Sequence, residues 1–217
     1  MEFRHPSEEY AYREGTGGST GALDETVGWG YWSGATREED GESTEVDGPV
    51  YWLAAEPMAQ AEIDGLEGPL HFNSYAGGHE LHGMARTTAA GHFDLEGGIG
   101  GVELLFDPMD NEVSGRLDLF QEHDGFTEAW WAEFSGDLSG GHGHFTGESL
   151  EGGFTYLPVD GGVEVLSELA AESHVDILLI REDLAGGGFH LITAEEIEAL
   201  GDEIQEAIGV FVIERSE

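Results

Sequence analysis

Short apolar runs, separated by glycine pairs, Asp-Gly steps and prolines, dominate the chain from residue 29 to residue 157. In the clearest runs the apolar residues occupy every second position. One face then carries Phe93, Leu95, Leu117 and Leu119, and the opposite face carries Asp94, Arg116 and Asp118. Successive side chains of a strand point to opposite faces, so this period with frequent turns predicts an antiparallel sheet with one solvated face.

The predicted strands of this region span residues 29–33, 50–55, 70–75, 81–86, 91–96, 102–106, 112–120, 126–134, 142–146 and 153–157. Many of the 35 glycines lie within or beside these runs. Glycine in a strand is typical of bulges and tight bends, which a strongly curved sheet requires. The pattern therefore predicts a sheet that closes as a barrel or folds as a sandwich.

The two ends of the chain differ from this central region. Residues 1–26 are polar and rich in Gly, Ser and Thr, which predicts an extended or flexible N-terminal arm. The remainder, 27–217, is expected to form one β domain with an α/β insertion at about 158–187. Within that insertion, 163–173 shows a helical stripe and 175–180 is a continuous apolar run typical of a buried strand.

A helix is predicted over 193–208. Thr193 and Glu196 have the spacing of a capping box, in which the side chain of each residue binds the backbone N–H of the other. The apolar stripe that follows consists of Ile197, Leu200, Ile204 and Ile208. After Gly209, residues 210–213 read as a closing strand, which is expected to pair beside 29–33.

The charge of the chain limits its environment and its partners. There are 46 Asp and Glu residues against 7 basic residues, all of them arginine, and the formal net charge is -39. Such a surface repels itself at low salt, whereas the Debye length falls to about 3 Å in molar salt. This composition predicts a protein of a halophile. The arginines are scattered singly, which argues against nucleic acid and against an anionic membrane surface as partners.

Several short motifs carry a family resemblance. Residues 27–34 (VGWGYWSG) resemble the "WGRW" entry strand of the C-terminal domain of FecR-type proteins, and 188–195 (GFHLITAE) resembles its closing element. The F-x-G and G-x-F steps at 134–136, 145–147 and 152–154 resemble hairpins that this domain shares with transferrin-binding-protein-like lipoprotein barrels. The resemblance implies an antiparallel β-barrel of about eight strands, here with one or two C-terminal helices packed on it. It implies no catalytic residues.

Histidines offer a candidate metal site. His142 and His144 lie two positions apart on a predicted strand, so both imidazoles share one face, about 7 Å apart. His79 and His82 belong to an earlier part of the sheet and are the other candidate ligands. A zinc site needs three or four such ligands. In the alternative interpretation, Phe145 belongs to the core and the two histidines simply face solvent.

Groups of carboxylates are weaker candidates for a cation-binding or catalytic site. Carboxylates at 38–42 and 107–112 offer oxygen ligands for weak binding of a divalent cation, but Asp, Asn and Gly are also ordinary turn residues. Glu128 and Glu133 flank Trp130 and Trp131, where a pair of carboxylates would be needed for glycoside hydrolysis. In a chain with so many carboxylates such pairs arise without catalysis. No cofactor is expected.

These features together predict a non-enzymatic, exported β-barrel domain that acts as a binding module at the cell surface or in the periplasm. Its partner is expected to be a protein or a second copy of the chain, without membrane insertion. One alternative is a structural subunit of an extracellular assembly or filament. Another is a small hydrolase or ligand carrier, which would require a deep polar cavity.

Overall fold

The computed structural model describes residues 2–4, 11–13, 17–39, 42–46, 48–76, 80–95, 100–123, 125–158, 165–197, 200–201 and 203–215. They form two compact units, Met1–Ala55 and Glu56–Glu217. The stretch 1–26 was expected to be an extended or flexible arm, and its described part contains short strands. Among the described residues, no helix is long and apolar enough to cross a membrane.

The first unit contains two small antiparallel sheets. One has the order β1-β2-β5-β6 and the other the order β3-β4-β7. Their strands are β1 Glu2–Arg4, β2 Ala11–Arg13, β3 Gly17–Ala22, β4 Gly28–Ser33, β5 Thr36–Glu39, β6 Glu42–Glu45 and β7 Val50–Ala54. The Trp32 and Trp52 rings, from the neighbouring strands β4 and β7, pack with their centroids 5.6 Å apart.

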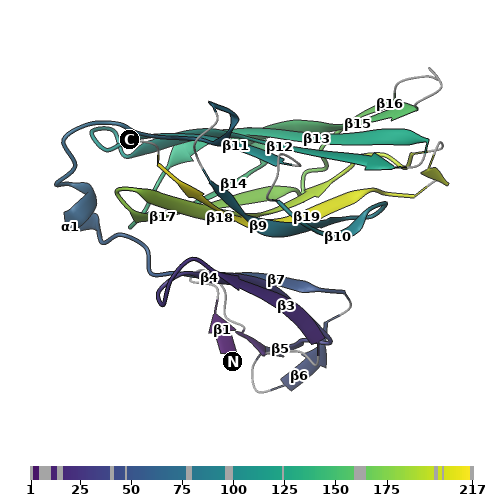
Figure 1. The fold of residues 1–217 in the computed structure, drawn as a ribbon, viewed down its shortest axis with the longest axis horizontal. Coiled ribbons are helices and arrows are strands. Elements are labelled where there is room, and N and C mark those ends of the chain that lie inside the picture. Colours follow the sequence, from purple (N-terminus) through teal and green to yellow (C-terminus); the bar gives the residue numbers. More distant parts are fainter. Residues whose placement is uncertain are drawn as a thin grey trace. The chain divides into compact units, whose positions relative to one another are not determined.

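The second unit consists of two six-stranded antiparallel sheets that lie one above the other (Figure 1). Sheet I has the order β16-β15-β13-β12-β11-β8. Its strands are β8 Leu70–Asn73, β11 Gly100–Asp107, β12 Glu112–His123, β13 Phe126–Asp137, β15 Leu150–Pro158 and β16 Val165–Glu168. Short helical turns accompany the sheets, among them α1 Gln60–Ile63, η1 Ser74–Ala76 and η2 Gly147–Ser149.

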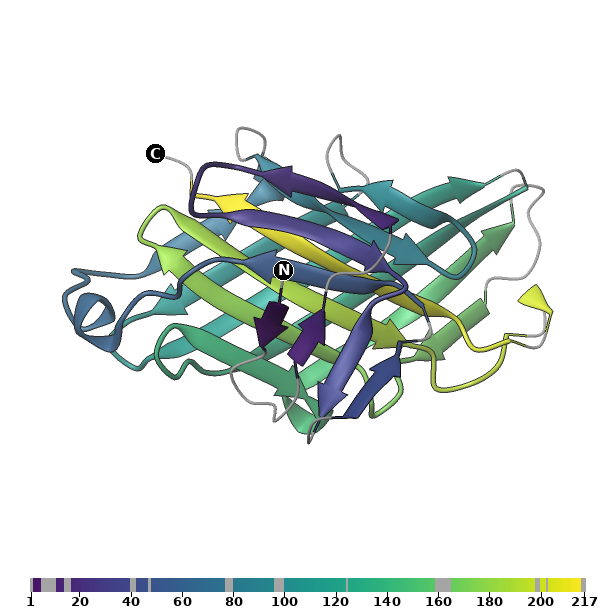
Figure 2. The same ribbon diagram turned by 90° about the horizontal axis from the view of Figure 1, so that it is seen from below.

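Sheet II has the order β10-β9-β19-β18-β17-β14, and its long strands run side by side in Figure 2. Its strands are β9 Leu81–Thr87, β10 Gly91–Asp94, β14 His142–Thr146, β17 His174–Arg181, β18 Leu184–Ile192 and β19 Glu206–Glu214. Among the described residues no ladder joins sheet II to sheet I, so the second unit is two facing sheets and the closed barrel is not formed.

One apolar core fills the space between the two sheets. Trp130 of β13 packs on Phe154 of β15 within sheet I, with ring centroids 4.7 Å apart. Phe134 of sheet I meets Phe145 of sheet II at 5.1 Å, which fixes the two sheets against each other. The predicted alternation is confirmed here: Leu117 is 1% exposed, whereas Arg116 faces the outside of sheet I. Buried aromatic and aliphatic side chains supply most of the stability of such a core.

Two predicted helices are wrong. Residues 165–168 form the edge strand β16, which pairs with β15. In the described part of 193–208 no α-helix forms: Ile197 bridges to Glu203, Leu200 belongs to a 3-10 turn, and Glu206 begins β19. Residues 210–213 do belong to a strand, but β19 pairs with β18 and β9 on its two sides, so it does not pair with 29–33.

Candidate functional site

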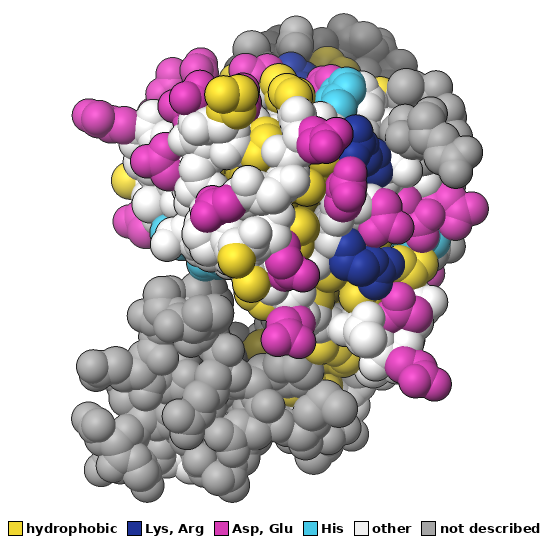
Figure 3. Space-filling model, turned by 90° about the vertical axis from the view of Figure 1, so that its left-hand side faces the viewer, with side chains coloured by type: hydrophobic (Ala, Val, Ile, Leu, Met, Phe, Trp, Pro, Cys, Tyr) yellow, Lys and Arg dark blue, Asp and Glu magenta, His cyan; other side chains and the backbone are white. Residues whose placement is uncertain are grey.

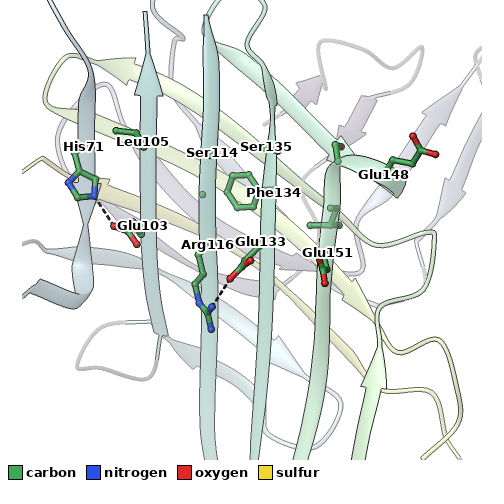
Figure 4. A pocket seen from close by; sticks show the side chains of 13 residues that line it. His71, Glu103, Leu105, Ser114, Arg116, Glu133, Phe134, Ser135, Glu148 and Glu151 are labelled. Carbon is green, nitrogen blue, oxygen red and sulfur yellow. Dashed lines mark hydrogen bonds and ion pairs between the residues drawn. The ribbon is translucent and has the colours of Figure 1, made fainter. Parts of the chain in front are cut away.

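An open groove of about 800 Å³ runs across the outer face of sheet I. Its floor comes from β8, β11, β12, β13 and β15, and η2 borders it. Outward side chains that alternate with the core positions of these strands line the groove (Figure 4). The lining includes His71, Glu103, Leu105, Arg116, Glu133, Glu148 and Glu151. Sequence reasoning did not find this site, because it is built from strands whose order and register become known only in the fold.

Arg116 is the positive centre of the groove. Its Nη1 donates to Glu133 at 2.7 Å, and its Nε and Nη2 donate to Asp118 at 2.8 and 3.0 Å. The hydrogen bonds with Asp118 are the largest cause of an Arg116 pKa raised above its usual value. The guanidinium also lies 6.0 Å from the ring centre of Trp131, within range of a cation–π interaction. These contacts fix the cation in one position on the sheet.

Asp118 is only 6% exposed although it faces outward, because Arg116 and Tyr75 cover it. The Tyr75 hydroxyl donates a hydrogen bond to Asp118. Burial, followed by this hydrogen bond and the nearby carboxylate charge, raises the pKa of Tyr75. The phenol therefore stays protonated and acts as a donor at neutral pH.

Carboxylates outnumber the cation in the groove, where four glutamates accompany one arginine. Glu103 is bound by His71 at 2.9 Å and by Asn73 at 3.1 Å. In contrast, the side-chain carboxylates of Glu148 and Glu151 are exposed and have no hydrogen-bond or ion-pair partner among the described residues. Carboxylates are also spread over the described surface shown in Figure 3. The groove can therefore accept positively charged groups.

Large apolar side chains are exposed on the same strands. Leu105 of β11 lines the groove and is 46% exposed, and Phe120 of β12 is 50% exposed. Leu157 of β15 is also exposed. Covering such side chains with a partner would remove apolar surface from water, which is favourable.

The structure places His142 and His144 on the outer face of sheet II. Phe145 of the same strand points the opposite way, into the core, and is 2% exposed. They meet residues that the sequence reasoning missed. The register aligns His144 of β14 with Asp176 of β17, and His144 Nδ1 lies 2.8 Å from Asp176 Oδ1. His142 Nε2 is 3.6 Å from the same oxygen, and His174 Nε2 is 4.0 Å from Oδ2.

Asp176 is thus surrounded by imidazoles. Burial would raise the pKa of its carboxyl, but hydrogen bonds with His142 and His144 and the charge of nearby imidazoles hold the pKa below its usual range. The ring of His174 lies 5.5 Å from that of His144 and 5.8 Å from that of His190 on β18. Asp176 is the polar residue inside the apolar run 175–180, and this break in the pattern could have identified it from the sequence.

The other predicted histidines do not join this cluster. His79 lies outside the described residues. His82 belongs to β9, which β19, β18 and β17 separate from β14. Its Nε2 lies 3.5 Å from Glu80 and 4.0 Å from Glu214, and these three residues form a separate group able to hold a cation. Glu80 is 74% exposed, so this group is loosely held.

The remaining candidate carboxylates form turns or lie in the core. Asp107 Oδ1 accepts the Met109 backbone N–H at 2.9 Å, which is ordinary turn chemistry. Part of the 38–42 stretch lies outside the described residues. Glu128 points into the core and accepts a hydrogen bond from Thr87 of β9, so it links the two sheets. It lies on the opposite face of β13 from Glu133, and the two carboxylates do not share a cleft.

Comparisons with known proteins give a limited result. No protein-family model matches the chain, and no curated protein matches it, so the resemblance to FecR-type proteins has no support. Among solved structures, the chain is similar to the isotype 1 transferrin binding protein B (TbpB) of serogroup B Neisseria meningitidis, with 11% identity and a TM-score of 0.43. The match covers 98% of this chain and 36% of that protein, so the chain spans about a third of its length. A likeness at this level does not establish a family.

Proposed function

We propose that this chain is a non-enzymatic binding module that holds a basic segment of a protein partner in the groove of sheet I. The observation that carries the proposal is the groove itself, in which glutamates surround an arginine already bound by carboxylates. Since Arg116 is neutralised by its own neighbours, Glu148 and Glu151 remain for the cations of a partner. A Lys- or Arg-containing segment has the complementary charge.

Apolar contacts add to this charge complementarity. Leu105 lies within the groove, and Phe120 and Leu157 are exposed on the outer face of the same sheet. A partner segment that combines basic with aliphatic or aromatic residues would cover both kinds of surface. The proposal includes an exported protein working at the cell surface or in the periplasm of a halophile, which the net charge of -39 supports. In molar salt only groups in direct contact still attract, so the apolar contacts matter most there.

The test is selection of peptides from a random displayed library on the full-length protein, followed by affinity measurement by fluorescence anisotropy at about 0.15 and 2 M NaCl. We expect a consensus with Lys or Arg beside a large apolar residue. The variant Glu148→Gln/Glu151→Gln should weaken peptide binding about 3- to 30-fold at the lower salt concentration, from the loss of two exposed ion pairs.

The matched control is Glu195→Gln/Glu196→Gln, which changes the net charge equally at two exposed residues outside the groove. It should leave the affinity unchanged. Equal losses in the two variants would mean that only the overall charge attracts the peptides. That result, or a consensus without basic residues, would refute the proposed groove.

A structural subunit is the second candidate function, and the open sheet edges favour it. The described ladders of the second unit end at β8 and β16 in sheet I and at β10 and β14 in sheet II. Unpaired edges can add strands from another copy. Size-exclusion chromatography between about 0.1 and 3 M NaCl discriminates the two functions, because a subunit should assemble as repulsion is screened and a binding module should stay monomeric.

A further inference from the structure

We propose that the imidazoles around Asp176 form a site for a divalent transition metal ion such as Zn²⁺, with His142, His144 and Asp176 as ligands and His174 as a fourth. This site is independent of the groove on sheet I, because it lies on the outer face of sheet II. It also differs from the predicted ligand set, since Asp176 and His174 take the places expected for His79 and His82.

The strand geometry brings the ligands together. His142 and His144 are two positions apart on β14, and His174 and Asp176 are two positions apart on β17. The two strands are neighbours with His144 opposite Asp176, His142 opposite Leu178 and His174 opposite Thr146, so His142 and His174 flank Asp176 from its two sides along the strands. Backbone hydrogen bonds hold the positions of the Cα atoms, and only side-chain rotation is needed to adjust the ligand atoms.

The distances between Asp176 and the imidazole nitrogens are close to those within a small-cation site. Zinc binds imidazole nitrogen and carboxylate oxygen at about 2.0–2.2 Å, so neighbouring ligand atoms of a tetrahedral site lie about 3.3 Å apart. His142 Nε2 and His144 Nδ1 lie 3.6 and 2.8 Å from Asp176 Oδ1, on either side of that value. His174 Nε2 approaches the other oxygen at 4.0 Å. Outside Glu80–His82–Glu214, no three described ligand atoms lie within 4.8 Å of one another, so the histidine side chains must rotate towards Asp176 when the ion binds.

The charge balance also favours a metal. Three imidazoles approach the single carboxylate of Asp176. A divalent cation uses neutral imidazoles as ligands and supplies the positive charge itself, so every nitrogen that faces Asp176 is used. Imidazole ligands select Zn²⁺, Cu²⁺ and Ni²⁺ over Ca²⁺ and Mg²⁺, which prefer oxygen. His144 is 48% exposed, which gives the ion a path from solvent.

The group Glu80–His82–Glu214 is the competing location in the described part of the chain. It supplies one imidazole, and fixing the exposed Glu80 side chain costs conformational entropy. A transition metal should therefore choose the site around Asp176.

Titration of the chelator-treated, full-length protein with ZnCl₂ by isothermal titration calorimetry tests the proposal. The wild type should bind one Zn²⁺ tightly, and His142→Gln/His144→Gln should weaken that binding at least about tenfold. The matched control His71→Gln/His92→Gln removes two imidazoles elsewhere and should change the dissociation constant less than twofold. His174→Gln and Asp176→Asn each test the remaining ligands.

A second measurement keeps the result independent of folding effects. In NMR spectra of the wild type, Zn²⁺ should shift the ring signals of His142, His144 and His174 together and leave those of His71 in place. Binding that survives in His142→Gln/His144→Gln but is lost in His82→Gln would assign the metal to the competing group and overturn the proposal. The absence of Zn²⁺ binding by the wild type would overturn it as well.

Discussion

The variant Gly187→Ala should destabilise the second unit strongly, because β18 has no space for a side chain at this position. Gly187 faces the core, and a Cβ atom there would lie 2.8 Å from Cζ of Phe211 on β19. It would also overlap the backbone oxygen of Asp176 on β17. The phenyl ring can rotate only within a packed core, and the backbone oxygen belongs to a strand of the same sheet. Relief of the overlap therefore requires movement of a strand.

Overpacking of this kind costs about 1–3 kcal/mol of unfolding free energy. For a domain of this size, 1 kcal/mol corresponds to about 2–4 °C in the melting temperature. The variant should therefore melt about 2–12 °C below the wild type. Urea unfolding at constant salt concentration, monitored by tryptophan fluorescence, measures the same loss as a lower midpoint, and Trp130 in the core reports on it.

Gly188→Ala is the matched control on the adjacent residue. Its Cβ would meet nothing closer than the Gly209 backbone oxygen at 3.6 Å and the Val210 side chain at 3.7 Å, which are ordinary contacts. The control should stay within about 0.5 kcal/mol of the wild type. If both variants unfold at the wild-type midpoint, or if the control is the less stable of the two, the close packing of β18 against Phe211 is refuted.

Two further predictions concern charge. The melting temperature should rise steeply between about 0.1 and 1 M NaCl as repulsion within the charge of -39 is screened, and a flat profile in differential scanning calorimetry would contradict the halophile interpretation. Burial raises the pKa of Glu128 in the folded state, against the opposing effects of Thr87 and His123. Stability should therefore fall as pH rises from the unfolded-state pKa through the folded-state pKa, and Glu128→Gln should gain stability relative to wild type over that interval. A difference in melting temperature that does not vary between about pH 4 and pH 8 would disprove this role of Glu128.

The strands were predictable from the sequence because their pattern is local. Alternation places Leu117 inside and Arg116 outside without any knowledge of neighbouring strands, and both placements are confirmed. The pairing of the strands was not predictable in the same way. β19 has a composition that suits any buried strand, and only the fold shows that β18 and β9 lie on its two sides.

The predicted helix over 193–208 failed because tertiary contacts outweigh local preference. Thr193 was expected to cap the first turn. Instead, its hydroxyl donates to the Glu195 backbone oxygen at 2.9 Å and accepts the Gln205 N–H at 3.0 Å. The backbone N–H of Thr193 also binds the Gln205 backbone oxygen, at 3.0 Å. These bonds tie Thr193 to the residue preceding β19, where a strand pairs on both sides and buries most of its side chains.

The candidate sites were predictable only in part. The alternation in 142–146 correctly places His142 and His144 on one outer face, with Phe145 in the core. The residues that meet them come from β17, and their identity depends on the register between two strands that are separate in sequence. The groove on sheet I needs five strands in their correct order, so no local pattern could have indicated it.

The position of β19 between β18 and β9 has a consequence for folding during synthesis. Neighbouring strands of sheet I follow one another closely in sequence, as β11, β12 and β13 do, so their hairpins can form as they leave the ribosome. β9 cannot complete its pairing early, because its Thr87 pairs with Ala207. Its neighbour β19 exists only after residues 206–214 have been made. Pairing between distant segments is slow. Until then sheet II lacks the strand that joins β9 to β18, so the apolar side of sheet I is only partly covered, and we expect the nascent chain to depend on chaperones during this interval.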